Sequence, residues 1–132
     1  MLAAIPLLAI AVIAYNVAAL ILRADLAHPL FAIDLPSGAA WSLSTGDLLI
    51  CLALILLFFE VLKATRAIGA AILDHVASMA LFVICLLEFL LVPACGTSVF
   101  LVITLTTFID VIAGFSVGVA SARRDISVTD RL

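Results

Sequence analysis

The chain has 132 residues, of which 67% are hydrophobic and only 11% carry a charge. Water-soluble domains usually hold about 25% charged residues, so this chain has too few to cover a surface that faces water. Its net charge of −3, with the six basic residues spread over three segments, also excludes a typical nucleic-acid-binding surface. We therefore expect one membrane domain, residues 1–132, whose main partner is the lipid bilayer.

The hydrophobic residues fall into four long runs. A helix rises about 1.5 Å per residue and needs about 20 residues to cross the ~30 Å core of a bilayer. The predicted fold class is therefore an all-α membrane protein, a bundle of four transmembrane helices over residues 2–22, 47–64, 71–92 and 98–120. The first run has no basic residue before it and is long for a signal peptide, so we expect it to be a retained span.

Between the first two runs, residues 30–43 predict a short extracytoplasmic β-hairpin. Bulky apolar residues alternate with small or polar ones on both sides of Pro36-Ser37-Gly38. A three-residue loop with Gly38 in the left-handed conformation puts the bulky residues on one face, because it pairs Leu35 with Ala39, Ile33 with Trp41, and Phe31 with Leu43. We expect that face to lie against the outer ends of the helices, with Trp41 as an anchor at the lipid headgroups.

The remaining elements follow directly. The sequence Ser44-Thr45-Gly46-Asp47 predicts a capping box at the start of the second span. Glu60 interrupts that span, but the apolar run before it outweighs the cost of one acid. The short uncharged sequence 93–97 makes the third and fourth spans antiparallel neighbours. Residues 122–132 are polar and predict a loosely ordered tail.

Basic residues predict the orientation in the membrane. One side of the predicted bundle carries only Arg23, whereas the other carries Lys63, Arg66, Arg123, Arg124 and Arg131. Cytoplasmic loops are enriched in Lys and Arg, so both termini are expected in the cytoplasm and the hairpin outside.

Ionisable residues within the spans are the candidates for function, since they are costly in lipid. Depths counted along the helices bring six polar residues together in the inner half of the membrane. We expect this layer to be structural and to contain Glu60, Lys63, Arg66, Asp74, His75 and Asp110.

Two further features lie outside this layer. Glu88 is near the outer end of the third span, at the depth of Asn16, and a hydrogen bond between them would join spans one and three. The alternative role for Glu88 is that of a proton-accepting carboxylate. In span four, Gly114 and Gly118 share a face with Asp110, which predicts close helix packing within the bundle or against another subunit.

No pattern of residues indicates chemistry. Cys51, Cys85 and Cys95 lack metal or redox spacing and are expected to be packing residues, with a Cys51–Cys95 disulfide as the alternative. His28 and His75 fall on opposite sides of the membrane, and the sequence has no phosphate-binding or dinucleotide-binding motif. We therefore expect no catalytic residue, no cofactor and no metal site, and no enzymatic activity.

Several stretches carry a resemblance to a known group. They are Ser44–Ile50, Leu57–Arg66, Leu73–His75 and Ser121–Asp125. In these the chain resembles a group of small, functionally uncharacterised four-span proteins of alphaproteobacterial inner membranes, over nearly its whole length. The resemblance implies a bacterial inner membrane and transfers no catalytic residue.

The sequence thus favours a non-enzymatic membrane protein that acts as an accessory or scaffold subunit. Its expected partners are other membrane subunits, or a second copy through the fourth span. A small proton- or ion-coupled transporter or channel that uses the buried carboxylates is the main alternative. A lipid- or quinone-binding membrane protein is the third.

Overall fold

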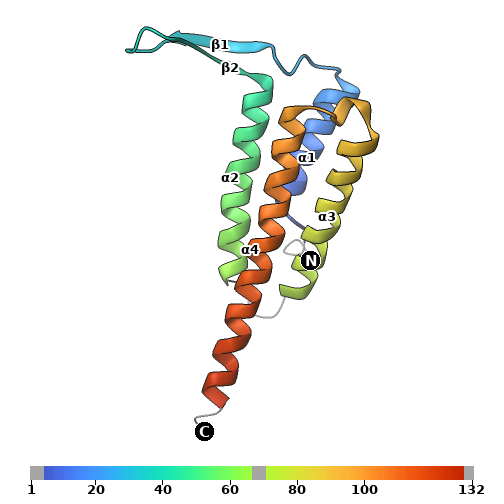
Figure 1. Ribbon diagram of the computed structural model, residues 1–132, viewed down its shortest axis with the longest axis vertical. Coiled ribbons are helices and arrows are strands. Elements are labelled where there is room, and N and C mark those ends of the chain that lie inside the picture. Colours follow the sequence, from blue (N-terminus) through green and yellow to red (C-terminus); the bar gives the residue numbers. More distant parts are fainter. Residues whose placement is uncertain (1–4, 67–70, 130–132) are drawn as a thin grey trace.

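The computed structural model describes residues 5–66 and 71–129, which form helical segments and one β-hairpin (Figure 1). In chain order these are α1 (Leu8–Asn16), the π-helical turn η2 (Val17–Ile21), β1 (Pro29–Asp34), β2 (Ala40–Ser44), α2 (Thr45–Arg66), α3 (Ala71–Leu91), the 3-10 turn η3 (Pro93–Cys95) and α4 (Ser98–Thr129). Within the described residues, α2, α3 and α4 are long and apolar enough to cross a membrane.

The first predicted span, 2–22, is longer than the helix found there. Residues 1–4 lie outside the described part, Ile5 to Leu7 are not helical, and the apolar helix covers only Leu8–Ile21. Pro6 explains the late start, because a proline disfavours the helical conformation of the residue before it and has no N–H to donate. The described residues therefore contain no fourth helix of full spanning length.

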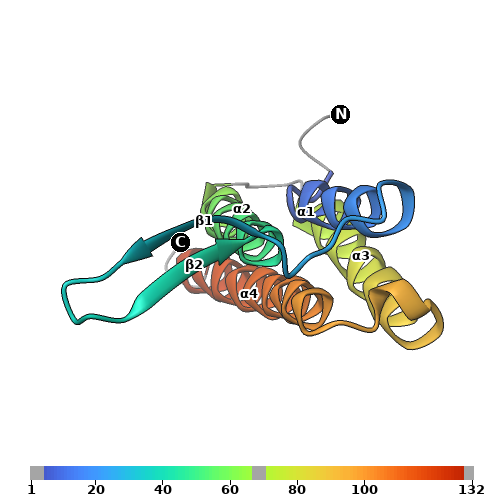
Figure 2. The same ribbon diagram turned by 90° about the horizontal axis from the view of Figure 1, so that it is seen from above.

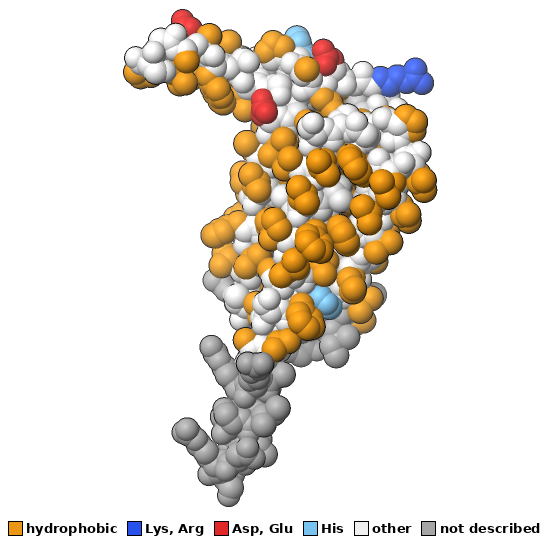
Figure 3. All heavy atoms as spheres, in the orientation of Figure 1, with side chains coloured by type: hydrophobic (Ala, Val, Ile, Leu, Met, Phe, Trp, Pro, Cys, Tyr) orange, Lys and Arg blue, Asp and Glu red, His pale blue; other side chains and the backbone are white. Residues whose placement is uncertain are grey.

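The helices pack around α4. Helix α4 lies against α2 and α3, and α1 packs against α2. Figure 2, viewed along the bundle, shows α1 beside α3 on the side away from the hairpin. The core includes the side chains of Leu8 and Tyr15, and the Tyr15 ring lies 4.6 Å from the ring of Phe100. Hydrophobic side chains also cover the outside of the bundle (Figure 3), as expected for helices surrounded by lipid.

The hairpin has the register that the alternation predicts. Strand β1 pairs antiparallel with β2, with Phe31 opposite Leu43 and Ile33 opposite Trp41. The N–H of Leu35 donates to the carbonyl of Ala39 at 2.9 Å. Gly38 has φ = +82°, the left-handed conformation that closes a three-residue loop.

The junction between β2 and α2 contains the predicted capping box. The Ser44 N–H donates to Asp47 Oδ2 at 2.9 Å, and the Asp47 N–H donates to Ser44 Oγ at 3.1 Å. Gly46, two residues after Ser44, is buried, and a Cβ there would lie 2.7 Å from Val99 Cγ2 and 3.1 Å from the Leu26 carbonyl oxygen. The base of the hairpin is therefore fixed against α4.

The hairpin does not cover the helix ends, contrary to our expectation. It leaves the top of α2 and extends sideways, beyond the bundle (Figures 1 and 2). Every residue of β1 is exposed, and Trp41 keeps 42% of its surface accessible. The cause is the junction itself: β2 ends at Ser44 and α2 begins at Thr45, so there is no loop that could fold the strands back over the bundle.

The tail predicted over 122–132 is helical for most of its length. Helix α4 continues to Thr129, and residues 130–132 lie outside the described part. No proline or glycine follows Gly118, so nothing in the sequence ends the helix near Ala120.

Candidate functional site

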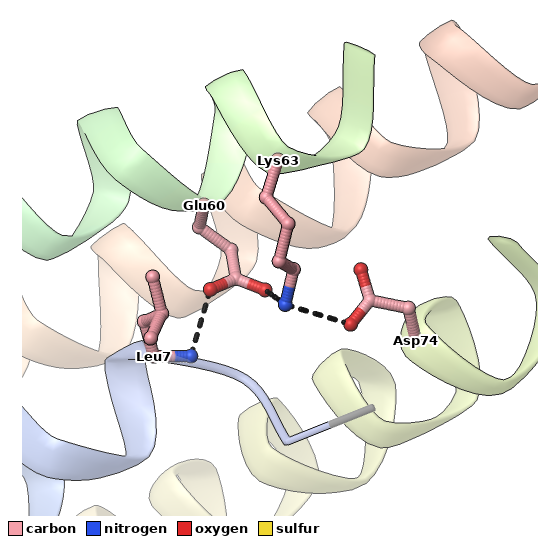
Figure 4. A network of polar contacts seen from close by, with 4 residues as sticks. All are labelled: Leu7, Glu60, Lys63 and Asp74. Atoms are coloured by element: carbon pink, nitrogen blue, oxygen red, sulfur yellow. Dashed lines mark hydrogen bonds and ion pairs between the residues drawn. The ribbon is translucent and has the colours of Figure 1, made fainter. Parts of the chain in front are cut away.

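Glu60 is the centre of the first group of polar contacts, which we call the Glu60 cluster: Glu60, Lys63, Asp74 and the backbone N–H of Leu7 (Figure 4). The Glu60 side chain is 2% exposed. Its Oε1 lies 2.5 Å from Lys63 Nζ, as an ion pair rather than an aligned hydrogen bond, and Lys63 Nζ lies 2.9 Å from Asp74 Oδ1. The cluster therefore joins α2 to α3 through one ammonium group held between two carboxylates.

The second oxygen of Glu60 joins α2 to α1. The N–H of Leu7 donates to Glu60 Oε2 at 2.7 Å, where α1 begins. Helix N-termini carry unpaired N–H groups and a partial positive charge, and Leu7 has no side chain that could cap them. Glu60 supplies this cap from a different helix. The sequence grouped Glu60 with Lys63 and Asp74, which the structure brings together, but this partner was missed, because a backbone N–H leaves no mark in the sequence.

Asp110 and His75 lie near the Glu60 cluster but make different contacts. Asp110, on α4, is 5% exposed and lies beside Ser78 of α3, with Glu60, Asp74 and Lys63 close enough to affect it electrostatically. The buried Nδ1 of His75 has no hydrogen-bond partner among the described residues. Arg66 is the remaining residue of the predicted layer, and its side chain lies outside the described part.

The second group, the Glu88 cluster, consists of Asn16, Glu88, Cys95, Tyr15 and Thr97, nearer the hairpin end of the bundle. Asn16 Nδ2 donates to Glu88 Oε2 at 3.0 Å, so the structure brings together the two residues of the predicted outer pair. Cys95 Sγ lies 3.6 Å from Asn16 Oδ1. Asn16 is the last residue of α1 before the π-helical turn, and this contact connects α1 to α3 and η3.

Tyr15 extends the Glu88 cluster to the turn between α3 and α4. Its hydroxyl donates to the Ala94 carbonyl at 3.0 Å and lies 2.6 Å from Thr97 Oγ1, which accepts the Phe100 N–H at 3.1 Å. The hydroxyl of Thr97 thus caps α4 and contacts Tyr15 at the same time. Tyr15 directly precedes Asn16 in the sequence, but its partners depend on the turn geometry and were not predicted.

The predicted packing face of α4 divides into two parts. A Cβ on Gly114 would lie 3.4 Å from His75 Nδ1, so Gly114 lets the imidazole approach α4 within the bundle. A Cβ on Gly118 would meet no atom of the described residues within 4 Å. The face therefore serves packing inside the bundle at Gly114 and is open at Gly118.

The cysteines are free, with Cys51 exposed and both Cys85 and Cys95 buried, so the alternative disulfide is not formed. Burial raises the pKa of the Cys95 thiol, and the nearby Glu88 carboxylate raises it further. Among the described residues no group of three or more His, Cys, Asp or Glu side chains could hold a metal ion.

A scan against protein-family models finds no match, and comparisons with curated proteins and with solved structures find none either. The roles of the Glu60 and Glu88 clusters follow from their geometry. Both consist of groups that bind one another across helices, which is an arrangement that fixes helix positions.

Proposed function

We propose that this chain is a non-enzymatic integral membrane protein that serves as an accessory or scaffold subunit of a membrane assembly. It crosses the bacterial inner membrane four times, with both termini in the cytoplasm and the hairpin outside. Three helices of sufficient length and hydropathy support membrane insertion. The excess of basic residues at the end opposite the hairpin supports the orientation.

The fourth crossing combines the short helix with the residues before it. Leu8–Ile21 has 14 residues, which at 1.5 Å per residue cover about 21 Å of the ~30 Å core. The sequence before this helix, Leu2 to Leu7, is also apolar, as the proposed crossing requires. Glu60 supports this arrangement, because its carboxylate accepts the N–H of Leu7 at the start of α1. Inside the membrane, that N–H would otherwise have no water to bind.

One observation carries the proposed scaffold role: α4 continues well past the ends of α2 and α3 (Figure 1). Gly114 lies against His75, whereas no atom of the described residues lies within 4 Å of a Cβ on Gly118, and the helix runs on to Thr129. An isolated helix shorter than about 12–15 residues is marginal in water. The projecting part of α4 is therefore expected to be stabilised by a partner, either another subunit or a second copy of this chain.

In-cell photocrosslinking tests this proposal. A photoreactive residue at Val119, on the open part of α4, should give a discrete protein adduct. The matched position is Leu105, which is exposed in the middle of the same helix and should react with lipid. If neither position gives a protein adduct and the native protein purifies as a monomer, the scaffold role is wrong.

The orientation has its own test. Cysteine introduced at Ser37, in the hairpin turn, should react with a membrane-impermeant maleimide added to intact spheroplasts. Cysteine at Thr65 should react only after the membrane is opened. Both variants need the native cysteines replaced by alanine, and native Cys95 is unsuitable as a reporter because it is buried. The reverse labelling pattern would invert the topology.

Asp110 favours a second candidate, a small proton- or ion-coupled transporter. It is a buried carboxylate beside a neutral serine, with an imidazole nitrogen lacking a described partner nearby on α3. If the protein transports an ion, proteoliposomes should show a flux that Asp110→Asn abolishes. No flux across a broad screen of ions and pH would remove this candidate.

A further inference from the structure

The hairpin arm, residues 29–44, is amphipathic and has no partner within the described chain. Phe31, Ile33, Leu35 and Trp41 are all substantially exposed, and the register places them on one face. The residues on the opposite face, Ala32, Asp34, Ala40 and Ser42, are small or polar. An exposed apolar face of this kind normally marks a binding surface.

The direction of the arm indicates which partner covers its apolar face. The arm runs across the axis of the bundle at the end where α2 begins (Figure 1). Strand β2 ends at Ser44, and the span of α2 begins at Thr45, so the arm leaves the bundle at the membrane boundary. Figure 3 shows hydrophobic side chains along the lower edge of the arm, on the side toward which the apolar helices extend, and an acidic side chain on its upper edge.

The aromatic residues of the arm fit the same surface. The rings of Phe31 and Trp41 lie 5.7 Å apart in an edge-to-face arrangement on the apolar face. Tryptophan is enriched where hydrocarbon meets lipid headgroups, because its ring is apolar and its N–H is polar. The apolar exterior of the bundle continues onto this face of the arm (Figure 3).

We propose that the hairpin arm binds lipid: it lies in the boundary between headgroups and acyl chains of the outer leaflet, with its apolar face in the membrane and Asp34 in water. This inference rests on the membrane insertion proposed above. It changes the role expected for the hairpin from a lid on the helices to an anchor beside them. The arm then fixes the depth and tilt of α2, to which it is joined without a loop.

The only tryptophan of the chain makes the test direct, because all tryptophan fluorescence comes from Trp41. The full-length protein is reconstituted alone into vesicles of phosphatidylethanolamine and phosphatidylglycerol that contain phosphatidylcholine brominated on its acyl chains. Bromine near the headgroup should quench Trp41 several-fold more than bromine near the end of the chain. Acrylamide in the water should quench Trp41 less in vesicles than in the unfolded protein.

Two aspartate variants test whether the face matters. Ile33→Asp places a charge on the apolar face, and Ala32→Asp places the same charge on the opposite face of the same strand. Ile33→Asp should shift the emission of Trp41 to longer wavelength and reduce quenching by bromine, while Ala32→Asp should change neither. Equal effects of the two variants would overturn the inference.

The outcomes separate this inference from the proposed function. If the protein fails to float with vesicles in a density gradient, membrane insertion itself is wrong. If it floats but acrylamide reaches Trp41 freely and bromine does not quench it, the arm is in water and the lipid inference is wrong. If Trp41 is shielded from both quenchers, the arm is covered by a second copy of the chain, which also overturns binding to lipid.

Discussion

Removing the Glu60 carboxylate should release the start of α1 from the bundle. In Glu60→Ala the Leu7 N–H loses its acceptor, which lies 2.7 Å away in the native protein, and Lys63 loses one of two carboxylate partners. Lys63 keeps Asp74 at 2.9 Å, so its ammonium group stays paired. The main cost therefore falls on the uncapped helix start.

The size of this effect follows from the contacts. A hydrogen bond to a charged group contributes about 1.5–3 kcal/mol, and a carboxylate at a helix N-terminus adds about 0.3–1 kcal/mol. We expect Glu60→Ala to lower the free energy of unfolding by about 2–4 kcal/mol. Glu60→Gln keeps an oxygen acceptor for Leu7 but loses the charge, and should cost about half as much.

Titration of the purified protein in mixed micelles with a denaturing detergent, followed by circular dichroism, measures the change. Phe59→Ala is the matched control, because Phe59 is the adjacent residue and faces outward with 52% of its surface exposed. Hydrogen exchange should also accelerate in α1 of Glu60→Ala before it does so in α3 or α4. Wild-type stability with unchanged exchange in α1 would refute the capping role of Glu60.

Three further predictions concern the hairpin end of the bundle. A double-mutant cycle with Asn16→Ala and Glu88→Gln, measured by the same unfolding titration, should give a coupling energy of about 0.5–1.5 kcal/mol. Additive effects of the two substitutions would show that Asn16 and Glu88 do not interact. Gly46→Ala should lower the free energy of unfolding by about 1–3 kcal/mol, because the new Cβ collides with Val99 of α4. Gly118→Ala should not lower it, and equal stabilities of the two variants would contradict the packing described. The pKa of the Cys95 thiol is raised by burial and by Glu88, so the thiol is protonated at neutral pH. Alkylation of Cys95, followed by mass spectrometry, should be slow in the folded protein and fast in denaturing detergent. Fast alkylation of the folded protein would show that Cys95 is accessible.

The features predicted best from the sequence depend either on neighbouring residues or on distances counted along a rigid helix. The hairpin register depends on alternation around Gly38, and both signals lie within a few neighbouring residues. The Asn16–Glu88 contact came from counting depth, which works because helices rise by a constant amount per residue. The backbone partner of Glu60 depends instead on where α1 begins, and Pro6, near the beginning of the apolar run, shifted that point by several residues.

The direction of the hairpin could not be obtained from its own pattern. Alternation shows that one face is apolar, but it does not show whether protein or lipid covers that face. The direction is determined at the junction, where Gly46 packs against Val99 and the capping box joins β2 to α2 without a loop. The contact of Gly46 with Val99 joins residues more than fifty positions apart, and only the folded chain brings them together.

The two polar clusters have a common explanation in the shortness of α1. Apolar contact alone gives little preference for one helix neighbour over another in lipid, so a short helix gains from polar contacts at its ends. Glu60 binds the start of α1, and Asn16 and Tyr15 bind at its end. Asp110 contributes to neither contact, since it lies on α4 beside Ser78. The transport hypothesis therefore depends on Asp110, because the positions of Glu60 and Glu88 are already explained by the fold.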